Sequence, residues 1–307
     1  MADYEQLRKD YAHLDSLTQA QLQSFKAEAT GMGVQSAIAG ARTAALGSGP
    51  RLVAEGDSWF DYMPGTDLID CLRYYHGYDI KNFAQAGDTL ENMVYGSKNT
   101  GSFAPRPCQF ELVAEALAAY RPKVFLFSGG GNDIAGDEFA TYLNHTASGN
   151  ASFLRLPVVD YMFAYFEKIL VTLIEKVKNA SPGTHIVMHG YGSPVPTGKG
   201  VGFFGFCFAG PWLRPALASK RIDVQQYGCG IVKTLIDRYN TMLAKLDANC
   251  ANFHHADVRD LVNPDTDWEN ELHLTNSAYA RVAYRIHEII EARSEERRVG
   301  KECRSRW

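Results

Sequence analysis

The chain has 307 residues, of which 46% are hydrophobic and 21% are charged, and its formal net charge is −4 at pH 7. This length and composition are typical of a globular protein with a sizeable core, which we expect to form one large α/β domain. A slightly acidic chain is poorly suited to bind phosphate backbones, so we expect no nucleic-acid partner.

The same sequence argues against export signals, membrane spans and metal sites. Residues 1–10 are charged and lack the apolar core of a signal peptide, and no run approaches the ~20 apolar residues of a membrane span. The expected location is therefore cytoplasmic, although a secreted chain whose leader had been removed would look the same. The six cysteines are scattered and form no C-x-x-C pair, so we expect no zinc site, and no metal or cofactor.

In chain order, the first feature is a helical extension over residues 1–50, which ends at Gly47-Ser48-Gly49-Pro50. We expect it to pack outside the sheet or to contact a second subunit, which would make a homo-oligomer possible. Strands and helices then alternate, as in a parallel sheet with right-handed crossovers and helices on both faces. The predicted strands are 52–54, 78–83, 123–128, 185–189 and 252–257, and the predicted helices are 67–75, 89–95, 108–120, 158–179 and 231–246.

Two segments depart from this alternation. Residues 190–223, called the insertion below, are rich in glycine, proline and aromatic residues and are too long for a simple connection. We interpret the insertion as a wall or lid of an acyl pocket, or else as a packed surface loop. Residues 294–307 are basic and break the preceding pattern; they resemble translated cloning-vector sequence, so we leave this tail out of the functional interpretation.

Chemically active residues lie at the boundaries of the predicted elements. Gly56-Asp57-Ser58 ends the first strand, Gly130-Gly131-Asn132-Asp133 follows the third, and His273 precedes the last helix. Gly87 follows the second strand. These four blocks, in this order, resemble those of the SGNH hydrolases, also called GDSL esterases and lipases, and the resemblance covers about residues 51–293.

The resemblance implies a fold as well as a site. SGNH hydrolases are three-layer α/β/α sandwiches with a flavodoxin-like, five-stranded parallel sheet in the order 2-1-3-4-5. With that order the first and third strands are neighbours, and the crevice between them is where ligands bind in open α/β sheets. Ser58 and Asn132 would lie together there, in a hydrolase domain over residues 51–293.

A serine is a poor nucleophile until a base removes its proton, and histidine suits that task near neutral pH. The resemblance therefore makes Ser58 the nucleophile and His273 the general base. It assigns the oxyanion hole to the backbone N–H groups of Ser58 and Gly87 and to the side-chain amide of Asn132. Because no G-x-S-x-G surrounds Ser58, an α/β-hydrolase nucleophile elbow is disfavoured.

One position differs from the family pattern. Where the family usually has aspartate, three residues before the histidine, this chain has Asn270. Asparagine can orient the imidazole, as in Cys-His-Asn proteases, but it cannot neutralise an imidazolium. Asp267, Glu269, Glu271 or a backbone carbonyl could take its place.

The predicted function is that of a metal-independent serine esterase that works through an acyl-serine intermediate on short-chain or aryl esters, with a small-molecule ester as its partner. Carbohydrate O-acetyl esterase, lysophospholipase, thioesterase and acyltransferase activities use the same chemistry and stay open. The alternative from another class is a binding protein that keeps the scaffold but has weak catalysis, since Asn270 replaces the usual acid.

Overall fold

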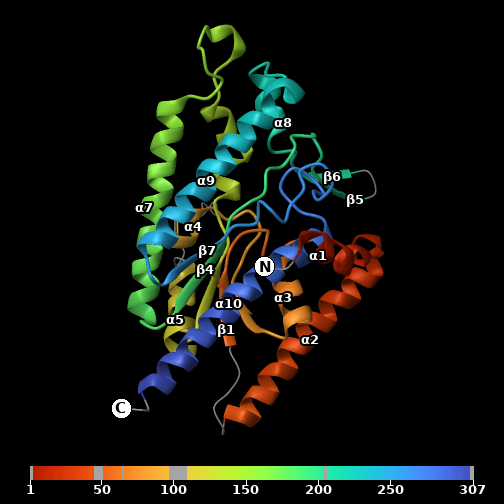
Figure 1. Cartoon of the computed structure of the whole chain (residues 1–307). Coiled ribbons are helices and arrows are strands. Elements are labelled where there is room, and N and C mark those ends of the chain that lie inside the picture. Colours follow the sequence, from red (N-terminus) through yellow and green to blue (C-terminus); the bar gives the residue numbers. More distant parts are fainter. Residues whose placement is uncertain (1–2, 45–50, 64, 97–108, 204–205, 305–307) are drawn as a thin grey trace, which may run out of the picture.

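Five parallel strands form the central sheet of the computed structural model, which describes residues 3–44, 51–63, 65–96, 109–203 and 206–304. Their order across the sheet is β2-β1-β3-β4-β7. Figure 1 labels three of these strands, β1, β4 and β7, in the middle of the molecule. Since β7 is the fifth strand of this sheet in chain order, the predicted order 2-1-3-4-5 is confirmed. The strands are β1 (Arg51–Glu55), β2 (Asp79–Asn82), β3 (Val124–Phe127), β4 (His185–His189) and β7 (Phe253–Ala256).

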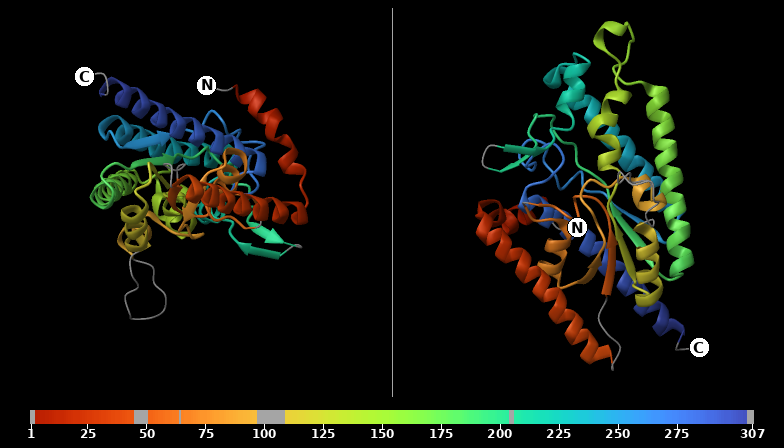
Figure 2. Two further views of the ribbon diagram at one scale, coloured as in Figure 1. Left: turned by 90° about the horizontal axis from the view of Figure 1, so that it is seen from below. Right: turned by 180° about the vertical axis from the view of Figure 1, so that it is seen from behind.

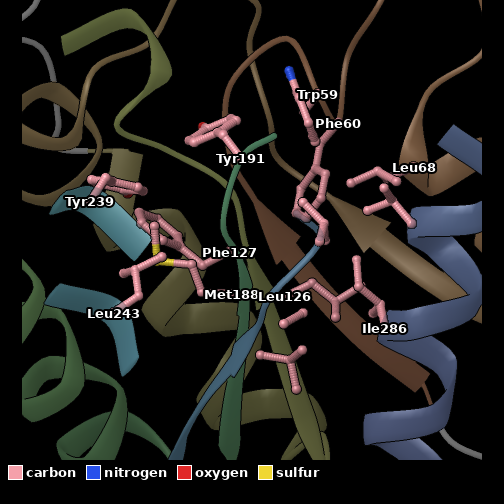
Figure 3. Close-up of a cluster of buried hydrophobic side chains, with 14 of the residues drawn as sticks. Trp59, Phe60, Leu68, Leu126, Phe127, Met188, Tyr191, Tyr239, Leu243 and Ile286 are labelled. Carbon is pink, nitrogen blue, oxygen red and sulfur yellow. The ribbon is translucent and has the colours of Figure 1, made fainter. Parts of the chain in front are cut away.

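The central strands are rich in apolar residues because they are covered on both faces. All four residues of β3 are buried, and β3 pairs in parallel register with β1 and β4. A strand buried on both faces needs a continuous apolar run rather than an alternating one, which is the pattern at 123–128. Figure 3 shows part of this core, where Leu126, Phe127 and Met188 of the sheet lie among side chains from helices on both sides.

Helices cover both faces of the sheet (Figure 2), so the predicted three-layer α/β/α architecture is confirmed. One layer holds α3 and α10, with α1 and α2 packed outside, and the other holds α4, α5, α7 and α9. The first group spans α1 (Tyr4–Tyr11), α2 (Gln19–Ala44), α3 (Leu68–His76) and α10 (Asn276–Arg304). The second group spans α4 (Leu90–Tyr95), α5 (Gln109–Tyr120), α7 (Leu156–Ala180) and α9 (Cys229–Asn249).

Shorter elements complete the described chain. These are the helices α6 (Gly131–Ile134) and α8 (Arg214–Ser219), 3₁₀ turns at Ala12–Ser16, Gly136–Tyr142 and Thr146–Ser148, and a π-helical turn at Val224–Gly228. Among the residues described, no helix combines the length and the apolar character that crossing a bilayer requires.

The N-terminal extension packs on its own domain. The Lys26 ammonium lies 3.3 Å from Asp70 of α3, and the ring of Phe25 packs on Tyr74 with 4.3 Å between centroids. Asp15 accepts the backbone N–H of Ser277 at the start of α10, at 2.8 Å. We expected this segment either to pack outside the sheet or to contact a second subunit. In the structure it packs on the outer side of the layer formed by α3 and α10.

The insertion is more regular than its composition suggests. It contains an antiparallel hairpin of β5 (Val201–Phe203) and β6 (Phe206–Ala209), followed by α8. Strands of three or four residues are too short for a periodic pattern, so the prediction of an irregular segment missed them. At the C-terminus, α10 runs without interruption to Arg304, so the change in composition at residue 294 does not end the helix.

Candidate active site

Ser58 and His273 come together although 215 positions separate them in the chain. His273 Nε2 lies 2.8 Å from Ser58 Oγ. Ser58 follows β1 in a turn that Asp57 stabilises by accepting the backbone N–H of Trp59 at 3.0 Å. The indole N–H of Trp59 donates to the carbonyl of Leu272 at 2.8 Å, which ties the serine turn to the histidine loop.

Asn270 is the hydrogen-bond partner of the other imidazole nitrogen. Its Oδ1 lies 3.0 Å from His273 Nδ1 and also accepts the backbone N–H groups of Leu272 and His273, both at 3.0 Å. Since a backbone N–H can only donate, the amide atom that faces these groups is the oxygen. An oxygen acceptor places the imidazole proton on Nδ1, so Nε2 presents its lone pair to Ser58, as a general base requires.

The three carboxylates considered as alternatives to Asn270 are bonded elsewhere. Asp267 forms a buried ion pair with Arg281 at 2.6 Å. Glu269 is exposed and pairs with Lys199 at 2.9 Å. Glu271 is fully buried and binds backbone N–H groups of the insertion. The structure therefore pairs His273 with an uncharged partner.

The surroundings of His273 are apolar and aromatic. Its ring stacks on Tyr62, with centroids 4.0 Å apart and an interplanar angle of 15°. The ring of Trp212 makes a T-shaped contact with it, with centroids 5.8 Å apart. Burial lowers the pKa of His273 to about 3, because an imidazolium there would lose its hydration and Asn270 supplies no compensating charge. The imidazole is thus neutral and able to accept a proton over the ordinary pH range.

The loops after β2 and β3 meet beside Ser58. Asn132 Nδ2 donates to the carbonyl of Asp88 at 2.9 Å, which leaves the second amide N–H of Asn132 for another acceptor. Gly87 adopts a φ of +84°, a conformation that favours glycine. Asp133 accepts the backbone N–H of Leu90 on both oxygens, at 3.1 and 3.0 Å, and burial raises its pKa to about 7. Asp133 therefore fixes the position of the asparagine relative to the glycine loop.

A second hydrogen-bonded network, which the sequence did not predict, lies beneath the nucleophile. Asp57 accepts the hydroxyl of Ser128 at 2.7 Å and that of Tyr191 at 3.0 Å, and Ser128 Oγ lies 2.8 Å from His189 Nε2. Tyr191 also accepts the backbone N–H of Gly131 at 3.2 Å. Because Ser128 is fully buried, this Asp, Ser and His group lies beneath the surface of the site. Tyr191 joins the serine turn to α6, because its hydroxyl contacts both Asp57 and Gly131.

Sequence reasoning did not single out Tyr62 or Tyr191, and it included Trp212 only as one aromatic residue of the insertion interpreted as a pocket wall or lid. Tyr62 lies only four residues after the nucleophile, which was a usable signal, and its hydroxyl accepts the amide of Asn270 at 3.2 Å. Tyr191 follows the end of β4, the neighbour of β3, so its position at the carboxyl edge of the sheet was also a usable signal. Trp212 had no signal beyond the aromatic content of the insertion.

An apolar cavity of about 40 Å³ opens beside Ser58 and Asn132. Its apolar walls include Ile134, Tyr191, Pro194, Leu213, Val232 and Ile236. One water needs roughly 10–15 Å³ in this measure, so the cavity has room for a few atoms only. Within the described ranges, no three or more His, Cys, Asp or Glu side chains gather in a way that could hold a metal ion.

Comparison with known proteins finds no matching family model and no matching curated sequence. Among solved structures, the lipase Lip_vut3 from a goat rumen metagenome is similar, with a TM-score of 0.53 and 10% identity over 78% of this chain and 97% of that one. An extracellular lipase from Streptomyces rimosus has a TM-score of 0.48, with 16% identity over 77% of this chain and 99% of that one. Phospholipase A1 from Streptomyces albidoflavus NA297 has a TM-score of 0.44, with 14% identity over 80% of this chain and 100% of that one. At these identities, the likeness to Lip_vut3 is one of fold.

Proposed function

We propose that this chain, which has the fold of the SGNH hydrolases, is a serine carboxylic-ester hydrolase that forms an acyl-serine intermediate. Two contacts of His273 carry the proposal. Its Nε2 lies 2.8 Å from Ser58 Oγ, and its Nδ1, on the other side of the ring, lies 3.0 Å from Asn270 Oδ1. A buried neutral histidine aimed at a serine hydroxyl has the geometry that serine acyl transfer requires.

In the proposed mechanism, His273 Nε2 takes the Ser58 proton while Oγ bonds to the ester carbonyl carbon. The backbone N–H groups of Ser58 and Gly87 and the free amide N–H of Asn132 stabilise the oxyanion, and such donors are commonly worth ~10²–10³ each in turnover. His273 then gives its proton to the leaving alkoxide as the C–O bond breaks. His273 then deprotonates a water whose oxygen bonds to the acyl carbon, and it returns the proton to Ser58 Oγ as the bond between Oγ and the acyl carbon breaks and the acid leaves.

The small cavity supports short acyl groups. A volume of about 40 Å³ beside Ser58 and Asn132 has room for a short acyl chain such as an acetyl group. Long-chain lysophospholipids would have to leave most of their acyl chain outside this cavity. Removal of acetyl groups from a carbohydrate is the second candidate, because the same cavity fits an acetyl group.

The test is hydrolysis of p-nitrophenyl esters of increasing acyl length by the wild type and by Ser58→Ala, together with labelling by a fluorophosphonate. We expect hydrolysis to be highest for short acyl groups, to be lost in Ser58→Ala, and to coincide with labelling of Ser58. Release of acetate from an acetylated sugar at a higher kcat/KM than from p-nitrophenyl acetate would favour the carbohydrate esterase. If the wild type cleaved no ester and its Ser58 stayed unlabelled, the binding-scaffold alternative would stand instead.

A further inference from the structure

A single buried carboxylate collects four backbone N–H groups from the insertion. Glu271 Oε1 accepts from Gly198 at 2.7 Å and from Arg214 at 3.2 Å. Its Oε2 accepts from Trp212 and from Leu213, both at 2.7 Å. The donors come from two stretches of the insertion, one before the hairpin and one after it. The hairpin is thus held at both of its ends.

The chemistry of this contact makes it hard to release. A carboxylate offers about four acceptor sites, and here the insertion fills all of them. The Glu271 side chain is fully buried, and a buried charge is tolerated only while it is hydrogen-bonded. Movement of the insertion would uncover the charge and leave four N–H groups to find other acceptors. The contact therefore favours one docked position of the insertion.

The docked position matters for the proposed acyl cavity. Glu271 lines this cavity and lies two residues before His273. Tyr191, Pro194 and Leu213, all within the insertion, line it as well. The backbone of Leu213 is thus bonded directly to Glu271 while its side chain closes the cavity.

We propose that Glu271 is a positioning residue that sets acyl-chain specificity. It docks the insertion as a fixed wall, and this wall limits the length of the acyl group. The inference rests on the proposed esterase function for its specificity, whereas the docking itself does not depend on activity.

The test uses Glu271→Gln in the full chain, with two readouts. The amide keeps one oxygen but turns an NH₂ group toward the N–H donors, so the wall loosens. Hydrogen exchange should speed up at the amides of Gly198, Trp212 and Leu213 and stay slow in the central sheet. In parallel, kcat/KM should shift toward longer p-nitrophenyl esters, by up to about four-fold for each further methylene that finds an apolar contact.

Two further variants make the result specific. Glu167→Gln removes the same charge from an exposed ion pair with Lys245 and should change neither readout. Leu213→Ala leaves the carboxylate in place and enlarges the cavity, so it should shift the acyl-length profile without faster exchange at Gly198. This second variant also decides the specificity of the wall if Glu271→Gln does not fold.

Unchanged exchange at the insertion amides in a folded Glu271→Gln protein would overturn the docking role. An equal loss of kcat/KM for all acyl lengths, in both Glu271→Gln and Leu213→Ala, would overturn the specificity role. Failure of the esterase proposal is a separate result, because it appears as an inactive wild type with an unlabelled Ser58, while hydrogen exchange still decides whether Glu271 docks the insertion.

Discussion

Replacement of Asn270 by aspartate tests the role of the uncharged partner of His273. The two side chains have nearly the same shape, and a carboxylate oxygen can accept the same three N–H groups that Oδ1 accepts. The second oxygen would face the Tyr62 hydroxyl, which can donate to it because burial raises the pKa of Tyr62 to about 12. The variant therefore changes the charge beside the imidazole and little else.

The expected effect is a shift in the acid limb of the pH profile. In the wild type, the His273 pKa of about 3 places that limb near pH 3, because only the neutral imidazole can take the serine proton. An opposite charge this close raises a pKa by about 1–3 units, so the limb of Asn270→Asp should lie at about pH 4–6. Each unit of increase in the His273 pKa corresponds to about 1.4 kcal/mol of extra stabilisation of the imidazolium. Because the imidazolium forms as His273 takes the serine proton, the same stabilisation should raise kcat/KM at pH 7 by up to about ten-fold per unit.

The assay is kcat/KM for p-nitrophenyl acetate from pH 3 to pH 8, with p-nitrophenol followed at its isosbestic wavelength. Asn270→Ala is the control, since it removes the acceptor without adding charge and should lower kcat/KM without moving the limb upward. A wild-type limb near pH 7 that stayed in place in Asn270→Asp would refute the reasoning. Such a limb would point to a different group, of which Asp133 is the candidate within the site.

Three further predictions concern stability. Burial raises the pKa of Asp133 to about 7, so the folded protein binds this proton more tightly than the unfolded chain, and the stability that the proton contributes is lost as the pH rises through 7. The Tm of Asp133→Asn minus the Tm of the wild type should therefore be larger at pH 8 than at pH 5, as measured by thermal unfolding at both pH values. Gly130→Ala should lose about 2–5 kcal/mol in urea unfolding, because φ is +96° and the new Cβ would lie 2.3 Å from a buried tyrosine hydroxyl, whereas Gly149→Ala, with φ of +73° and open space, should lose only about 1 kcal/mol. Asp267→Asn should cost about 3–5 kcal/mol in the same assay because it leaves Arg281 buried without its ionic partner, and a loss below about 1 kcal/mol would contradict a buried pair.

Much of the architecture was accessible from local sequence patterns. Apolar runs at 123–128 and 185–189 are buried strands because a parallel sheet covered on both faces demands continuous hydrophobicity. The helix predicted over 67–75 corresponds to α3 (Leu68–His76), which ends at Gly77 in a left-handed conformation. The hairpin in the insertion was not predicted, because its short strands carry no period and are held by Glu271, far away in the sequence.

The sequence alone determined which residue types stand at the ends of the elements, among them Ser58, Asn132 and His273. The tertiary structure alone decided which groups pair. Asp267, Glu269, Asn270 and Glu271 are nearly adjacent in the chain, and spacing could not separate them as partners of His273. The turn sends one toward Arg281, one toward solvent, one toward the imidazole and one into the insertion. Side-chain direction in an irregular loop follows from the packing around it, and that packing comes from other segments of the chain, such as Tyr62, which is 208 positions away from Asn270.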